Sequence, residues 1–234
     1  MTLPVHLLCA GAAKGLVQAL ADRLAADCGV HIDGQFGAVG AMREALLAGA
    51  ACDVMVVTDS MLQALADAGH LRGDTRTPLG RVKTGIAVCA GQRAPDIATP
   101  AALKLALLAA DSIYFPDPER ATAGIHFAQV MRQLGVFDPC VQRFRTFANG
   151  ATAMREMALA GSKQAIGCTQ VSEILYTPGV RLAGALPTEF ELATLYSAAV
   201  STHATDPALA AQVIALLAGE ASASLRREGG FEPE

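Results

Sequence analysis

Short apolar runs alternate with longer amphipathic runs from the first residues of the chain, and this alternation limits the fold more than any other feature. The runs "VHLLCA" (5–10) and "CDVMVV" (52–57) are typical of buried strands. Each is followed by a segment with helical spacing of apolar residues, such as Leu16, Leu20 and Leu24 after the first run. Three such strand–loop–helix units within the first 70 residues predict a mostly parallel sheet with helices on both faces.

The pattern is interrupted by the Gly-, Pro- and Arg-rich stretch "LRGDTRTPLGR" (71–81), after which a second series of strands and helices begins. The chain later returns through a strand-like run, "ELATLYSAAV" (191–200), to a terminal helix. We therefore predict an α/β fold of two lobes joined by a two-strand hinge. The first lobe is expected to comprise residues 1–83 and 195–234, and the second, inserted lobe residues 84–194, with the ligand cleft between them.

The composition excludes several classes of protein. Apolar residues make up 52% of the 234 residues and charged residues 17%, which is typical of a globular chain. The net charge of -4 and the lack of a basic cluster argue against a nucleic-acid partner. No apolar run approaches the ~20 residues of a membrane segment. Because "MTLPVHLLCAG" lacks the basic start of an export signal, we expect a cytoplasmic protein, or a periplasmic one if a leader has been removed.

Cysteine and histidine spacing gives no sign of a metal centre. The six cysteines contain no CxxC pair, and the five histidines contain no HxH or HExxH pattern. We expect free thiols that behave as small apolar side chains, with no metal site and no cofactor.

Five strand-to-helix junctions are rich in small and polar residues. They are "GAAKG" (11–15), "GAVGA" (37–41), "RATAG" (120–124), "NGATA" (149–153) and "CTQ" (168–170). Ligands of open α/β sheets bind beyond the carboxyl ends of the strands, where helix N-termini present unpaired N–H groups to anions. Small residues let a ligand approach the main chain, and Thr122, Asn149, Thr152 and Thr169 can add side-chain hydrogen bonds. These junctions predict a clamp for a small anion, formed by both lobes.

Charged side chains near the junctions extend this prediction. Lys14 is one of only four lysines and stands in the first turn of a helix, where its charge opposes the macrodipole by about 0.3–1 kcal/mol. It is either a solvated surface residue or a group that neutralises a ligand carboxylate. Arg81 is expected at the lobe crossing, Thr58 at a helix start, and His126 beside a helix start as a structural residue or a proton carrier.

The order of these segments resembles the molybdate-binding branch of the type 2 periplasmic solute-binding proteins. The stretches that carry the resemblance are "FGAVGAMREALLAGAACDVMVVTD", "YFPDPERATAGIHFAQVM", "NGATAMREMALAGSKQAIGC" and "LRREGGFEP". The resemblance implies two hinged α/β lobes around an anion, with Ala123, Asn149 and Cys168 at ligand positions of the second lobe.

The family's serine hydroxyls are missing from this chain. Ala12 and Val39 stand where the family has serines, and each lost donor to a buried dianion is expected to cost roughly 1.5–3 kcal/mol. The donors that remain are main-chain N–H groups near Ala12, Ala13, Val39, Gly40, Thr122, Ala123 and Gly124. With Lys14, this set favours a carboxylate over a tetrahedral oxyanion.

Three functions follow from this reading. The branch is also similar to aconitate isomerase, so we first expect a cytoplasmic isomerase of unsaturated di- or tricarboxylates that moves an allylic proton. Lys14 would then hold a carboxylate, and His126 or Glu173 would carry the proton. The alternatives are a molybdate-, tungstate- or carboxylate-binding protein of an ABC transporter, if an export leader was removed, and a cytoplasmic ligand sensor.

Overall fold

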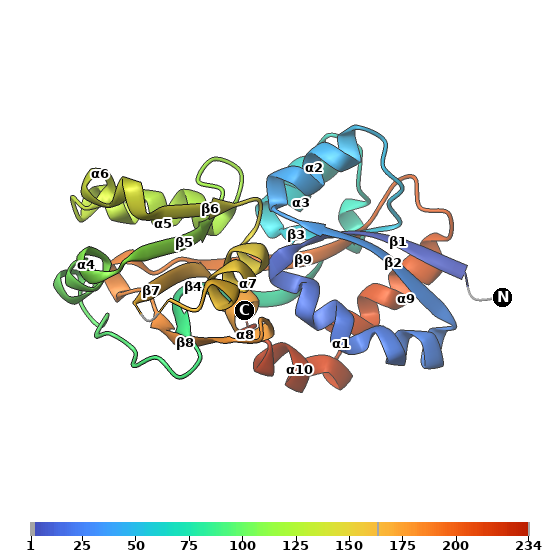
Figure 1. Cartoon of the computed structure of the whole chain (residues 1–234). Helices are drawn as coiled ribbons and strands as arrows, with labels where there is room; N and C mark the ends of the chain where they lie inside the picture. The colour runs from blue at the N-terminus through green and yellow to red at the C-terminus, as the bar shows by residue number, and fades with distance from the viewer. Residues whose placement is uncertain (1–2, 163, 234) are drawn as a thin grey trace. The chain divides into compact units, whose positions relative to one another are not determined.

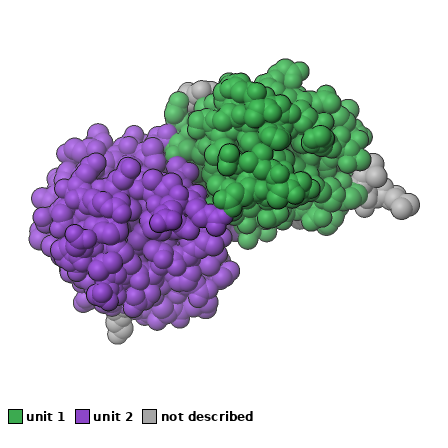
Figure 2. Space-filling view, turned by 90° about the horizontal axis from the view of Figure 1, so that it is seen from above, with its two compact units in different colours: residues 1–82, 194–234 green, residues 83–193 purple. Residues whose placement is uncertain are grey.

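The computed structural model describes residues 3–162 and 164–233, and the chain divides into two compact units. Unit 1 comprises Met1–Val82 and Thr194–Glu234, and unit 2 comprises Lys83–Ala193 (Figure 2). Two strands contribute residues to both units: β4 (Thr77–Cys89) and β9 (Ala193–Val200).

Unit 1 is built on a mixed sheet with a parallel centre. Strand β1 pairs in parallel with β2 and β3, and β9 pairs with β3 in the antiparallel sense. The other strands of this unit are β1 (Leu3–Ala10), β2 (Val30–Gly37) and β3 (Val54–Thr58). Its helices are α1 (Gly11–Cys28), α2 (Val39–Leu47), α3 (Asp59–Asp67), α9 (Pro207–Ala218) and α10 (Ala223–Glu228). Helices α1 and α9 cover one face of the sheet, and α2 and α3 cover the other (Figure 1).

Unit 2 is organised around β4, β7, β5 and β6. Strand β4 pairs antiparallel with β7 and β8, whereas β5 pairs in parallel with β6 and β7. These strands are β5 (Ser112–Pro116), β6 (Phe144–Phe147), β7 (Ala165–Gln170) and β8 (Val180–Ala185). The helices are α4 (Pro100–Ala109), α5 (Thr122–Gln133), α6 (Phe137–Cys140), α7 (Gly150–Ala160) and α8 (Val171–Tyr176). Short 3-10 turns occur at Gly73–Thr75, Val141–Arg143, Thr188–Phe190 and Glu220–Ser222.

The sheet of unit 2 separates two apolar clusters. The larger cluster packs side chains of α4 and α5 against Ile86, Phe115 and Cys168. The smaller one packs Met154 and Met157 of α7, together with residues of α8, onto the other face. The predicted α/β class is therefore confirmed, and its physical basis is the alternation of apolar strands with one-sided helices.

A buried carboxylate anchors the start of β3. Asp53 is 4% exposed and accepts hydrogen bonds from the backbone N–H groups of His6 (2.8 Å) and Thr205 (2.7 Å). Two segments distant in sequence are thus joined to one turn. Buried carboxylates need such partners because an unpaired charge in the core is costly.

Cys9, Cys52, Cys89, Cys140 and Cys168 are free thiols, and burial raises the pKa of Cys52 to about 12. The side chain of Cys28 lies outside the described residues. Within residues 3–162 and 164–233, no single helix is long and apolar enough to span a membrane. Two consecutive helices, Pro207–Ala218 and Glu220–Glu228, are long and apolar enough only when taken together, and the chain bends by 53° between them.

Candidate functional site

Helices α1 and α2 begin at the carboxyl ends of adjacent parallel strands without a side-chain cap. Ala10 and Ala38 occupy their N-cap positions in extended conformation, and neither helix has an acidic residue in its first turn. The register places Ala10 opposite Gly37, so the two helices start at the same edge of the sheet. The first N–H groups of a helix have no intrahelical acceptor and attract anions. The predicted ligand donors Ala12, Ala13, Val39 and Gly40 all lie in these two first turns.

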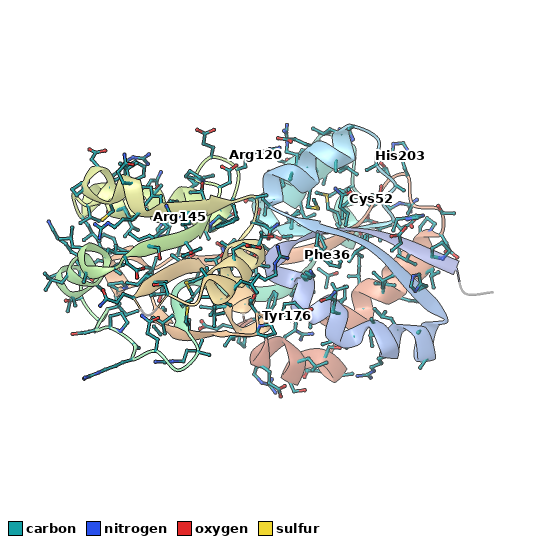
Figure 3. All side chains as sticks on the ribbon, viewed as in Figure 1. Phe36, Cys52, Arg120, Arg145, Tyr176 and His203 are labelled. Atoms are coloured by element: carbon teal, nitrogen blue, oxygen red, sulfur yellow. The ribbon has the colours of Figure 1, made fainter. Side chains whose placement is uncertain are left out.

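Lys14 adds a full positive charge to this edge. Its Nζ atom lies 5.6 Å from the centroid of the Phe36 ring, which belongs to the end of β2 and is labelled in Figure 3. Within the described part of the chain, Lys14 makes no ion pair with a carboxylate. A cation–π contact at a partly exposed site contributes only about 0.5–1 kcal/mol. This weak contact leaves the Lys14 ammonium group available to bind an anion.

Helix α3 differs from its two neighbours because it carries a carboxylate. Thr58 stands at the N-cap position, and its side chain makes no capping hydrogen bond. The Asp59 Oδ1 atom accepts a hydrogen bond from Ser197 (2.8 Å) and lies 3.5 Å from the Arg76 Nε atom. The negative charge of Asp59 makes the start of α3 less suited to an anion, and Thr58 is 7% exposed.

In unit 2, the start of α5 is uncapped as well. Its N-cap residue, Ala121, makes no side-chain hydrogen bond, and the first turn contains no acid. Thr122 is half-buried, and Ala123 is buried. Gly124 has a packing role, because a Cβ atom there would lie 2.3 Å from the carbonyl oxygen of Pro116. The predicted donors of this junction thus remain main-chain N–H groups.

The N–H groups in the first turn of α7 are instead bound by side chains of the protein itself. The Asn149 side chain accepts the N–H of Thr152 (2.8 Å), and the Glu173 carboxylate accepts the N–H of Ala151 (3.3 Å) and the Thr169 hydroxyl. Burial raises the pKa of Glu173 above its ordinary value of 4.5, although these donors act in the opposite direction. The Asn149 side chain, the Thr152 N–H and the Thr169 hydroxyl thus make contacts within unit 2, and their role as ligand donors stays a prediction.

Three further predicted site residues also have contacts within their own unit. The His126 Nε2 atom lies 2.7 Å from the carbonyl oxygen of Phe190, so this nitrogen carries the proton and donates it. Cys168 is fully buried in the larger apolar cluster, and desolvation raises its pKa. The main chain of Arg81 exchanges two hydrogen bonds of 2.8 Å with Glu232. Cys168 is thus a core residue in the structure.

Two buried polar residues that the sequence did not single out face each other on the sheet of unit 2. Gln170 ends β7 and is 3% exposed, and Thr84 stands directly opposite it on β4 and is 1% exposed. Gln170 could have been identified as a candidate from the sequence, because it stands at the end of a predicted strand, two residues after Cys168. Thr84 gave no signal, because only the register of β4 against β7 shows its position. Among the described residues, no group of three His, Cys, Asp or Glu side chains is arranged to hold a metal ion.

Comparisons with known proteins identify the family and the fold of the chain. Residues 5–232 match the family model of bacterial extracellular solute-binding proteins. The periplasmic molybdate-binding protein of Azotobacter vinelandii superimposes with a TM-score of 0.81 at 17% identity, over 98% of this chain and 99% of that chain. The sulfate-binding protein SubI of Mycobacterium tuberculosis H37Rv gives a TM-score of 0.76 at 16% identity, over 98% of this chain and 86% of that chain.

A curated relative adds an enzyme to this group. Aconitate isomerase of Pseudomonas sp is 26% identical over 185 residues, which cover 77% of this chain and 67% of the relative. The resemblance expected from the sequence is therefore confirmed, with the fold of type 2 periplasmic binding proteins. The chain belongs to the family of bacterial extracellular solute-binding proteins.

Proposed function

We propose that this protein is a solute receptor that binds a small anion, preferably a carboxylate, outside the cytoplasm and delivers it to an ABC transporter. The first N–H groups of α1 and α2 in unit 1 are proposed to bind the anion, and those of α5 in unit 2 are a second proposed anion-binding position. Lys14 supplies the counter-charge. The observation that carries the proposal is the distribution of helix caps.

Of the helices away from these junctions, α4, α7 and α9 have a side-chain cap, whereas α3, α6, α8 and α10 have none. Thr99 caps α4, Asn149 caps α7 and Asp206 caps α9 through side-chain oxygens. By contrast, alanine stands at the N-cap positions of α1, α2 and α5. Alanine at an N-cap costs about 1 kcal/mol relative to Ser, Thr, Asp or Asn. This cost falls on three junctions where an anion would provide the missing acceptor.

The donor set favours a carboxylate ligand. Ala12 and Val39 offer only main-chain N–H groups in the first turns of α1 and α2. The Lys14 ammonium is a compact point charge that suits a carboxylate oxygen. The similarity of the fold to a molybdate-binding protein and a sulfate-binding protein supports the broader class of small anions.

Isomerisation of aconitate is the second candidate function, favoured by the 26% identical relative. An isomerase needs a base that can reach the ligand. The two candidates, Glu173 and His126, are engaged with α7 and with the Phe190 carbonyl. The family and the contacts therefore favour the receptor, which the sequence alone placed second.

Calorimetric titration with molybdate, tungstate, sulfate, citrate and both aconitates tests the proposal. We expect micromolar or tighter binding of at least one carboxylate, weakened at least about 10-fold in Lys14→Ala by the loss of a charge-assisted contact. Lys104→Ala on α4 is the matched control and should bind as the wild type does. If no anion binds, the receptor proposal is wrong.

The same samples separate the receptor from the isomerase. Aconitate in deuterated water is followed by proton NMR in the presence of the protein. The receptor leaves both isomers unchanged, and an isomerase interconverts them and exchanges the allylic proton.

A further inference from the structure

Thr84 carries a buried hydroxyl group that has no hydrogen-bond partner within the described residues. Its side chain is 1% exposed, and its Oγ1 atom is unpaired. The main chain at this position is fully used, because the N–H donates to Leu192 (3.0 Å) and the carbonyl accepts from Leu186 (3.2 Å). Buried polar atoms in native proteins nearly always have a partner, so the Thr84 hydroxyl is open to hydrogen bonding with a group that reaches it.

The register of the sheet identifies the face on which this hydroxyl lies. Thr84 stands opposite Gln170, and Ile86 stands opposite Cys168. Directly opposite residues of an antiparallel pair share a face, as do residues two positions apart along a strand. Ile86 and Cys168 belong to the cluster that includes Phe127 of α5, so Thr84 lies on the face that α5 covers.

The direction of the strands identifies the edge. Gln170 is the last residue of β7, and β5 runs parallel to β7. Helix α5 follows β5, packs against both strands, and starts beyond the carboxyl end of β5. Thr84 and the uncapped start of α5 therefore share one face and one edge of the unit 2 sheet.

We propose that the Thr84 hydroxyl donates a hydrogen bond to the anion that also binds the first N–H groups of α5, and so acts as a specificity-determining residue. This inference rests on the proposed receptor function. The hydrogen bond between His126 and the Phe190 carbonyl does not involve the Thr84 hydroxyl.

The test is Thr84→Val, which keeps the shape of the side chain and removes the hydroxyl. With the carboxylate that binds the wild type most tightly, we expect Thr84→Val to weaken affinity about 10- to 100-fold, as expected for a lost hydrogen bond to a charged group. Thr84→Ser should bind within about 3-fold of the wild type, since it keeps the donor. The ligand-free Thr84→Val protein should unfold at the same or a higher temperature than the wild type, because an unsatisfied group has been removed.

Ser172→Ala is the matched control. Ser172 is a second buried hydroxyl without a partner among the described residues, but α8 packs on the opposite face, where Val171 approaches Gly85. Ser172→Ala should leave affinity unchanged. Thr84→Ala provides the same comparison if the valine variant folds poorly.

The outcomes separate this inference from the receptor proposal. If the wild type binds an anion and Thr84→Val binds equally well, the inference is wrong and the receptor proposal stands. Equal weakening by Thr84→Val and Ser172→Ala also overturns the inference. If the wild type binds no anion of the panel, both fail.

Discussion

Helices α1 and α7 start at junctions of similar composition, yet their first turns are in opposite electrostatic states. The start of α1 has no side-chain cap and no acid, and Lys14 increases its positive charge. The start of α7 has an Asn149 cap and a buried carboxylate, Glu173, against its N–H groups. A Gly- and Ala-rich helix start is therefore open to an external anion only where the protein has not already placed a carboxylate against its N–H groups.

The largest effect is expected at the contact between α7 and its internal carboxylate. A Cβ atom on Gly150 would lie 1.9 Å from the Thr169 Oγ1 atom and 2.1 Å from the Glu173 Oε2 atom. Gly150→Ala must therefore displace buried groups, and we expect it to lower the free energy of unfolding by about 2–4 kcal/mol. Denaturant unfolding measures this change. A variant as stable as the wild type would show that the carboxylate is not held at the start of α7.

Substitution of Glu173 is expected to change the free energy of unfolding by a smaller amount, and this change should depend on pH. Glu173→Ala should cost about 1–3 kcal/mol, because the buried donors of α7 and Thr169 lose their acceptor. Since burial raises the pKa of Glu173, the folded state binds the carboxyl proton more tightly than the unfolded state does. The stability that this group contributes is full below its ordinary value of 4.5 and is lost as the pH rises through the folded pKa.

Glu173→Gln isolates that pH dependence. The stability of the wild type relative to Glu173→Gln should fall as the pH is raised from below 4.5, in denaturant titrations at a series of pH values. A difference that stays constant with pH, or that grows, would contradict a raised pKa.

The smallest change in stability is expected from giving α2 the cap that it lacks. Ala38→Asp should raise the free energy of unfolding by about 0.5–1 kcal/mol, because aspartate accepts a first-turn N–H and complements the helix dipole. The same carboxylate should weaken anion binding by at least about 10-fold through competition and repulsion. Calorimetry and thermal unfolding of one preparation measure both. If the variant is more stable and its affinity for the anion is unchanged, the start of α2 is not part of the anion site.

The α/β class was predictable because it depends on local periodicity. Runs such as 5–10 and 52–57 become strands β1 and β3. The uncapped starts of α1 and α2 could also be predicted, since alanine precedes each helix.

The roles of the side chains in unit 2 could not be predicted from the sequence. Whether Asn149 and Thr169 face a ligand depends on Glu173, which reaches the start of α7 from a later helix. The position of Thr84 depends on the pairing of β4 with β7. Both are long-range contacts that no local pattern records.

The most direct test of the account follows individual backbone amides by NMR while the tightest-binding anion is titrated into the protein. The account predicts large shifts for the amides in the uncapped first turns, and little change for those that Asn149 and Glu173 already bind. The expected responders are Ala12, Ala13, Val39, Gly40, Thr122 and Ala123, and the expected non-responders are Ala151 and Thr152. Shifts centred on Ala151 and Thr152, with the first turns of α1, α2 and α5 unaffected, would contradict it.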